Sequence, residues 1–172
     1  MKIWLKETDG QWKTYEGELA ELAPELKKRN ITLSASASIG AYASIGDDAS
    51  IGDDASIGAY ASIGAYASIG ASASIGAYAS IGAYASIGDD AKVERSYDCV
   101  VMGPLGSRAT MLTGYLKKDG SLWIGTGCFL GPIAQFVERV DQAHKGTEHA
   151  QAYGAAVEFI RARLERSTAV KA

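Results

Sequence analysis

The sequence predicts an all-β solenoid core of about 3.7 triangular coils, with α+β caps at both ends. Isoleucine recurs every six residues from Ile39 to Ile87, and glycine follows it each time. A period of six would place these side chains on every face of an α-helix. A glycine in each repeat would also cost a helix about 1 kcal/mol relative to alanine. A helix is therefore excluded, and a repeating strand unit is indicated.

Each six-residue unit is predicted to form a four-residue strand followed by a two-residue corner. Because side chains alternate along a strand, Ala43 and Ile45 are expected to point inward, while the serine between them and Gly46 point outward. Three such sides close a coil of eighteen residues. Degenerate copies at both ends extend the repeat to residues 33–98, which makes eleven hexads and about 3.7 coils.

The Ile-Gly-x-x-Ala-Ser hexads resemble the hexapeptide repeat of left-handed parallel β-helix proteins. This resemblance implies coils wound left-handed, against the usual right-handed preference of parallel strand connections. The hexads vary almost only at the corner pair, which indicates an engineered or idealised version of such a protein. Residues 103–108 and 127–131 resemble the C-terminal region of uncharacterised bacterial or phage hexapeptide-repeat proteins, and that resemblance implies no activity.

A change in composition marks an N-terminal cap over residues 1–32. Residues 2–16 alternate around an Asp-Gly pair, which predicts a β-hairpin. Residues 18–29 predict a short helix with a stripe of leucines, interrupted early by Pro24. A cap is needed because the end of a solenoid exposes unpaired backbone groups and an open apolar core.

A C-terminal cap is predicted over residues 99–172. Residues 108–115 and 122–126 flank a Lys-Asp-Gly turn and predict a second hairpin. Two helices are expected after it, over about residues 132–143 and 148–166. The apolar stripe of the second helix is expected to comprise Ala152, Ala155, Ala156, Phe159, Ile160 and Leu164. Three further residues are expected to complete a small core against the last coil, namely Phe129, Phe136 and Val140.

Charge and cysteine content restrict the function classes. The net charge is −3 and no basic stripe is visible, so neither nucleic acid nor an anionic membrane is an expected partner. No apolar run reaches the length of a secretory signal or a transmembrane helix, and a cytoplasmic location is expected. Cys99 and Cys128 lack metal-binding spacing and are expected to be buried, reduced thiols. Cys128 is expected in a packed Gly-Cys-Phe turn with no cation beside it.

The resemblance suggests a catalytic function that the repeat does not support. Most familiar hexapeptide-repeat proteins are trimeric acyltransferases, in which a histidine on the solenoid is the general base and acyl-CoA or acyl carrier protein lies between subunits. Residues 33–98 contain no histidine and no inserted loop. His144 and His149 are expected at a helix end and in the first turn of the next helix, as a capping or solvated pair. The several histidines of the related carbonic anhydrases are also missing.

We therefore expect no catalytic, cofactor-binding or metal-binding residue and no small-molecule substrate. The predicted function is that of a non-catalytic structural repeat protein, most simply a designed or regularised β-solenoid scaffold. An acyltransferase-like enzyme is the alternative. A weaker alternative is a surface or ice-binding solenoid, because the outward serines and glycines make flat faces, although they lack the Thr-x-Thr arrays of antifreeze β-helices.

Residues eighteen positions apart share a corner column, which sorts the acidic residues. Asp54 and Asp90 are expected about 9–10 Å apart with a serine between them, and Asp48 is expected below two tyrosines. Aspartate pairs can bind calcium or magnesium. The alternation avoids stacking of like charges and favours a solubilising role over a divalent-ion site. The first of these columns consists of Ser36, Asp54, Ser72 and Asp90.

The tyrosines fall into two further columns, one of Tyr42, Tyr60 and Tyr78 and one of Tyr66 and Tyr84. Neighbours are expected about 4.8 Å apart, close enough for ring stacking. One corner residue of each hexad is expected to need a positive φ, which costs a tyrosine about 1 kcal/mol. Either ring stacking or contact with a partner must compensate for this backbone cost. The columns are thus surface decoration, or they mediate self-association through the tyrosine-bearing corners or as a homotrimer.

Overall fold

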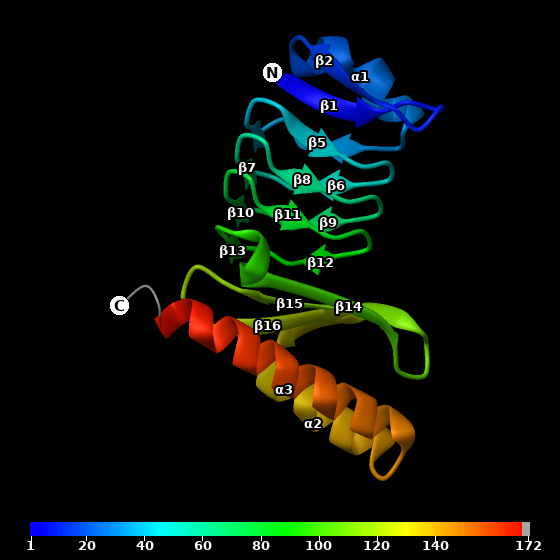
Figure 1. Cartoon of the computed structure of the whole chain (residues 1–172), viewed down its shortest axis with the longest axis vertical. Coiled ribbons are helices and arrows are strands. Elements are labelled where there is room, and N and C mark those ends of the chain that lie inside the picture. Colours follow the sequence, from blue (N-terminus) through cyan, green and yellow to red (C-terminus); the bar gives the residue numbers. More distant parts are fainter. Residues whose placement is uncertain (170–172) are drawn as a thin grey trace.

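The predicted solenoid is present, with a cap at each end (Figure 1). The computed structural model describes residues 1–169, with side chains as far as residue 165. Within that range, eleven short strands, β3 to β13, wind around three faces and make between three and four coils. Parallel strands stack on each face in the orders β3-β6-β9-β12, β4-β7-β10-β13 and β5-β8-β11. The all-β solenoid core with caps is therefore confirmed.

The hydrogen-bonded strands are shorter than predicted. The repeat predicts four-residue strands, whereas most strands contain only a Ser-Ile pair. The flanking residues bend toward the corners but still pair between coils, as when the Gly40 N–H donates to the Ile57 carbonyl at 2.7 Å. The strands are β3 (Thr32–Leu33), β4 (Ser38–Ile39), β5 (Ala43–Ile45), β6 (Ser50–Ile51), β7 (Ser56–Ile57), β8 (Ser62–Ile63), β9 (Ser68–Ile69), β10 (Ser74–Ile75), β11 (Ser80–Ile81), β12 (Ser86–Ile87) and β13 (Lys92–Val93).

The interior contains columns of isoleucine and alanine in strict register. Ile63 pairs with Ile45 in the coil before it and with Ile81 in the coil after it. All three are at most 1% exposed, and Ala43 is fully buried. Burying an isoleucine stabilises a fold by about 1.5–3 kcal/mol before conformational entropy is counted. The inward alternation predicted from the repeat is confirmed at these positions.

Where another coil follows, the glycine of a hexad lies against that coil and does not simply face solvent, which corrects the sequence prediction. Gly46 is buried. A Cβ added to Gly46 or Gly64 would lie 2.4 Å from the backbone nitrogen of Ala65 or Ala83 in the next coil. Real Cβ atoms essentially never approach backbone so closely. The glycine is therefore required because successive coils touch there.

The N-terminal cap extends one face of the solenoid and covers its end. β1 (Lys2–Lys6) pairs antiparallel with β2 (Trp12–Glu16) and parallel with β5, in the place of a further coil. The helix α1 (Leu19–Lys28) packs Leu22 and Leu26 on the solenoid core. The predicted hairpin and helix are both present, and the helix continues through its proline.

Arg29 ties this helix to the hairpin. Its side chain is only 8% exposed and forms ion pairs with Glu25 at 3.0 Å and Glu7 at 3.3 Å. Its Nε also donates to the Lys6 carbonyl at 2.7 Å. Its Nη2 donates to the Tyr15 hydroxyl of β2 at 3.2 Å, so one guanidinium fixes the helix end against both strands of the hairpin.

The C-terminal cap is a four-stranded antiparallel sheet with two helices. The predicted hairpin corresponds to β15 and β16, and two outer strands were not predicted. Their Gly-Pro pairs are typical of turns, although proline is tolerated in edge strands. The helix bounds lie close to those predicted. The elements are β14 (Cys99–Leu105), β15 (Thr110–Leu116), β16 (Leu122–Thr126), β17 (Phe129–Pro132), α2 (Ile133–His144) and α3 (Glu148–Ala169).

One face of this sheet packs on the solenoid and the other on the helices (Figure 1). Tyr115 belongs to the solenoid core, whereas Leu112 and Ile124 pack with α2 and α3. Phe129 and Phe136 are in contact at 5.3 Å between ring centroids, as expected of a small apolar core. That core lies on the helix side of the sheet, not against the last coil as predicted.

The apolar stripe predicted for α3 is only partly correct. Ala155 is exposed, and Phe159 is 56% exposed. Alanine and glycine are common all around this helix, so the sequence pattern did not define one face. The buried residues described on α3 are Tyr153, Ala156, Val157, Ile160 and Leu164.

Side-chain hydroxyl groups cap the last coil. The exposed edge of a parallel stack presents unpaired backbone N–H groups. Ser80 N–H donates to Ser96 Oγ at 3.0 Å, in the short 3₁₀ turn Ser96–Asp98, and Ser86 N–H donates to Thr113 Oγ1 at 3.0 Å. The C-terminal cap thereby ends the hydrogen-bond ladder. Among the described residues, no helix is long and apolar enough to cross a membrane.

Candidate functional site

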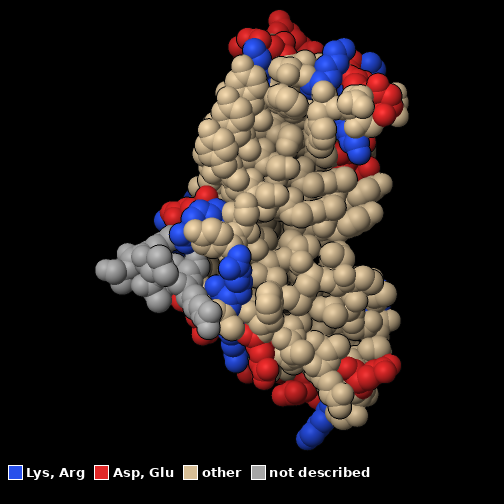
Figure 2. Space-filling view, in the orientation of Figure 1, with Lys and Arg blue, Asp and Glu red and all other residues tan. Residues whose placement is uncertain are grey.

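Two tyrosine ladders run along the solenoid, as predicted. Neighbouring rings of Tyr42, Tyr60 and Tyr78 stack with centroids 5.2 Å apart, and Tyr66 stacks on Tyr84 at 4.8 Å. The ladders border the face of β5, β8 and β11, because one corner precedes each of these strands and the other follows it. In Figure 2 the charged residues gather mainly toward the two caps, and much of the solenoid surface in view is uncharged.

All five tyrosines of the two ladders occupy the corner position that has a positive φ. Their φ angles lie between 58° and 61°, and Asp48 and Ser72 adopt the same conformation in other hexads. This left-handed conformation costs a residue with a side chain about 1–2 kcal/mol. Stacking of aromatic rings contributes about 0.5–1.5 kcal/mol per pair. The three stacked pairs therefore offset part of the backbone cost of the five tyrosines.

The acidic residues occupy the predicted columns. Asp54 lies one coil after Ser36, and its N–H donates to the Ser36 Oγ at 2.9 Å. Asp48 lies one coil before Tyr66, and its charge and hydrogen bonding raise the pKa of the Tyr66 phenol. Asp48 also accepts a hydrogen bond from the Asn30 side chain at 2.8 Å. In the described part of the chain, no group of three His, Cys, Asp or Glu residues could hold a metal ion.

The two histidines lie where the sequence predicts. His144 is the last residue of α2, and His149 lies in the first turn of α3. Their rings meet edge to face at 5.7 Å, and His144 also contacts Tyr153 at 5.9 Å. Both are separated from the solenoid by the C-terminal sheet.

The prediction for Cys128 is wrong. The side chain is exposed, and the Arg108 Nη1 donates to its sulfur at 3.3 Å. Together with Arg139 and His144, these residues line a cavity of about 210 Å³. The cavity thus brings a thiol, two guanidinium groups and an imidazole together. Sequence reasoning missed it because the tip of the β14–β15 hairpin meets the turn after β16 only in three dimensions.

The structure agrees better with the prediction for Cys99, since this residue is partly buried and its thiol is free. Burial, helped by the charge of Asp98, raises the pKa of its thiol to about 12. A thiol with that pKa is not a nucleophile near neutral pH, because the thiolate is the reactive form. Cys99 is therefore a packing residue at the start of β14.

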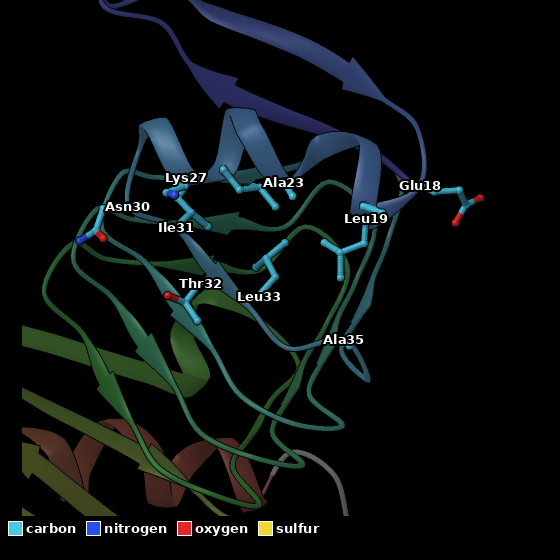
Figure 3. Close-up of a pocket in the computed structure, with 11 residues that line it drawn as sticks. Glu18, Leu19, Ala23, Lys27, Asn30, Ile31, Thr32, Leu33 and Ala35 are labelled. Carbon is cyan, nitrogen blue, oxygen red and sulfur yellow. The ribbon is translucent and has the colours of Figure 1, made fainter.

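The largest hollow described lies at the N-terminal end, between α1 and β3 (Figure 3). It measures about 830 Å³ and has a mainly aliphatic lining. Leu19 and Leu33 lie on its inner side, whereas Glu18 points away from it. Both leucines are only partly buried and pack on the solenoid core. The hollow is thus an incompletely covered end of that core.

The repeat segment is similar to a known protein family. Residues 30–65 and 55–89 both match the family described as "Bacterial transferase hexapeptide (six repeats)". Comparisons with curated proteins and with solved structures gave no match. The family match agrees with the stacked triangular coils and supports the left-handed winding. Residues 30–89, which form most of the β-solenoid, are thus similar in sequence to the hexapeptide-repeat family.

Proposed function

We propose that the chain is a non-catalytic structural protein, a rigid β-solenoid scaffold that holds its two caps at a fixed separation and rotation. The observation that carries this proposal is the capping of the last coil. Buried Tyr115 accepts the Gly88 N–H at 2.9 Å, and Thr113 and Ser96 accept the N–H groups of Ser86 in β12 and Ser80 in β11. These three hydrogen bonds end the stack and fix the C-terminal cap on the last coil.

The regularity of the repeat supports a designed or regularised origin. The hexads of the solenoid reuse one inward pair, alanine and isoleucine, and one glycine contact between coils. Consistency of local and global preferences is the criterion by which idealised proteins are built. A scaffold of this kind gains from identical coils, since each coil then offers its neighbours the same surface.

An acyltransferase-like activity is the second candidate, favoured by the transferase family that the repeat matches. In such an enzyme the cavity at Cys128 would be the only grouping described above that combines a thiol with imidazole and guanidinium groups. Isothermal titration with acetyl-CoA, followed by an acetyl-transfer assay, separates the two candidates. We expect no saturable binding and no transfer. Saturable binding that Cys128→Ser and Arg108→Ala weaken would overturn the scaffold proposal.

Coil duplication tests the scaffold directly. Repeating residues 55–72 once inserts one full coil, keeps the order of the corner columns and lengthens the solenoid by about 4.8 Å. We expect one cooperative unfolding transition at a higher temperature, because each coil adds core and interfaces. Loss of cooperative unfolding would contradict equivalent, interchangeable coils that stabilise one another through their interfaces. Light scattering on both proteins tests the proposed self-association through the tyrosine corners or as a homotrimer.

A further inference from the structure

A second hollow lies where the corner bearing Tyr66 and Tyr84 meets the C-terminal cap. It measures about 520 Å³. This corner joins β8 to β9 and β11 to β12, at the right of the solenoid in Figure 1, above the β14–β15 hairpin. Clefts of about 300–1,000 Å³ are the usual size for small-molecule sites. The hollow therefore has the capacity for a compact organic ligand.

One wall of the hollow is aromatic. Tyr66 and Tyr84 stack with their rings within 2° of parallel, and each is more than half exposed. Tyr84 is the last ring of its column, because the repeat ends before the chain returns to this corner with another ring. Exposed, fixed rings offer faces and edges to a further aromatic ring without loss of side-chain freedom.

The opposite wall comes from the cap. Pro104 and Met111 belong to β14 and β15, and they line the hollow together with Ala109. Methionine sulfur makes favourable contacts with aromatic rings and adapts its shape to a ligand. The hollow is thus bounded by an aromatic wall on the solenoid side and by an aliphatic and thioether wall on the cap side.

The polar groups in the hollow are all uncharged. Ser68 and Ser86 lie on the solenoid side, and Thr110 lies on the cap side. Thr110 Oγ1 shares a hydrogen bond with Thr126 Oγ1 at 3.1 Å, which fixes its orientation. No Lys, Arg, Asp or Glu is among the lining residues described. Hydroxyl groups favour a ligand that carries neutral donors or acceptors, because an ionic group would lose hydration without a counter-charge.

We propose that this hollow binds a neutral, planar aromatic small molecule between the Tyr66–Tyr84 stack and the Met111 wall. The rings supply the main contact, and the serine and threonine hydroxyls bind polar atoms at the ligand's edge. The site goes beyond a scaffold role and does not depend on it, because its aromatic wall consists of tyrosine side chains that stay exposed on the solenoid surface.

Titration with Nile red, a neutral planar dye, tests the proposal by fluorescence and calorimetry on the full chain. We expect one saturable site per chain. Tyr66→Ser combined with Tyr84→Ser should weaken binding at least tenfold. Serine already occupies the same corner conformation at Ser72, so this variant is compatible with the fold. Ser68→Phe keeps both rings and fills the hollow, and it should weaken binding by a similar factor.

The matched control is Tyr60→Ser combined with Tyr78→Ser, which removes two stacked rings from the other ladder. It should leave the affinity within twofold of the unmodified chain. No saturable binding, equal loss in the control, or unchanged binding in Ser68→Phe would each overturn the site. The anionic dye 1-anilinonaphthalene-8-sulfonate should bind this site at least tenfold more weakly. Equal affinity for it, lost in the Tyr66/Tyr84 variant, would overturn the neutral ligand class.

Discussion

The phenol oxygen of Tyr115 in the C-terminal sheet accepts a hydrogen bond from the backbone N–H of Gly88 in the last coil, at 2.9 Å. Tyr115 is fully buried, and its ring packs in the same apolar cluster as the isoleucine columns. One side chain thus closes the apolar end of the solenoid and satisfies a ladder donor that has no further coil to bond. The cap and the solenoid are coupled through this residue.

Replacing Tyr115 with phenylalanine should destabilise the protein by about 1–3 kcal/mol. The ring would still fill the core, but the Gly88 N–H would be left buried without a partner, and an unsatisfied buried donor costs about that much. Urea unfolding followed by circular dichroism measures the change. Tyr97→Phe is the control. Tyr97 is 42% exposed, so loss of its hydroxyl group should change the stability very little. Equal stability of the Tyr115 variant and the unmodified chain would contradict the capping role.

Alkaline pH should destabilise the fold. Burial raises the pKa of Tyr115 to about 12 from an ordinary 10.0, and the pKa of Cys99 to about 12 from 9.0. The folded state therefore favours the protonated forms, so this stability is complete below about pH 9 and is lost as the pH rises toward 12. Each group contributes a slope of up to about 1.4 kcal/mol per pH unit. Urea midpoints measured from pH 7 to 11 should fall above pH 9, and Cys99→Ala should flatten the curve between pH 9 and 10.

Gly64→Ala should destabilise the solenoid by about 2 kcal/mol or more. The added Cβ would lie 2.4 Å from the Ala83 nitrogen, and coils in register on both sides limit how far that backbone can move. Gly82 is the matched control, since it holds the same repeat position in the last coil. A Cβ there would meet Val101 at an ordinary 3.5 Å. Gly82→Ala should lie between neutral and about 1 kcal/mol stabilising. Similar losses in both variants would contradict the coil-contact explanation.

The solenoid could be predicted from sequence because its contacts repeat with the sequence. Ile45 contacts Ile63, eighteen residues later, for the same reason that Ile63 contacts Ile81. One hexad therefore predicts the inward face, the corner columns and the tyrosine stacking together. The strand length was overestimated, and the glycine was misread because alternation along a strand says which side a residue faces and not how closely the next coil approaches.

The caps were harder to predict because their contacts occur once. β14 and β17 contain Gly-Pro pairs that indicate turns in isolation, and only pairing with β15 and β16 makes them strands. The contact between Arg108 and Cys128 depends on that same sheet. The hollow beside Tyr84 likewise needs the hairpin of the cap to form its second wall. No local pattern contains this information.

Stacking in the tyrosine ladder should be measurable by comparing Tyr60→Asn with Tyr78→Asn. Both variants relieve the same left-handed backbone strain, because asparagine tolerates a positive φ. Tyr60 stacks on two rings and Tyr78 on one. Tyr60→Asn should therefore be less stable than Tyr78→Asn by about 0.5–1.5 kcal/mol in urea unfolding. Equal stabilities would mean that the ladder is decoration and does not contribute to the fold.

Ile63→Asp should unfold the whole solenoid. Ile63 is 1% exposed in a middle coil, with an isoleucine in register on either side. The substitution removes about 1.5–3 kcal/mol of burial and introduces a carboxyl group that finds no counter-charge inside a core of isoleucine and alanine, for a total loss above about 4 kcal/mol. Ser62→Asp is the control, because Ser62 is the outward neighbour on the same strand and should change stability by less than about 1 kcal/mol. Thermal melts followed by far-ultraviolet circular dichroism compare the two variants. A cooperative, native-like melt of Ile63→Asp would mean that the coil can shift its register to expose position 63, and the inward alternation of the repeat would then be wrong.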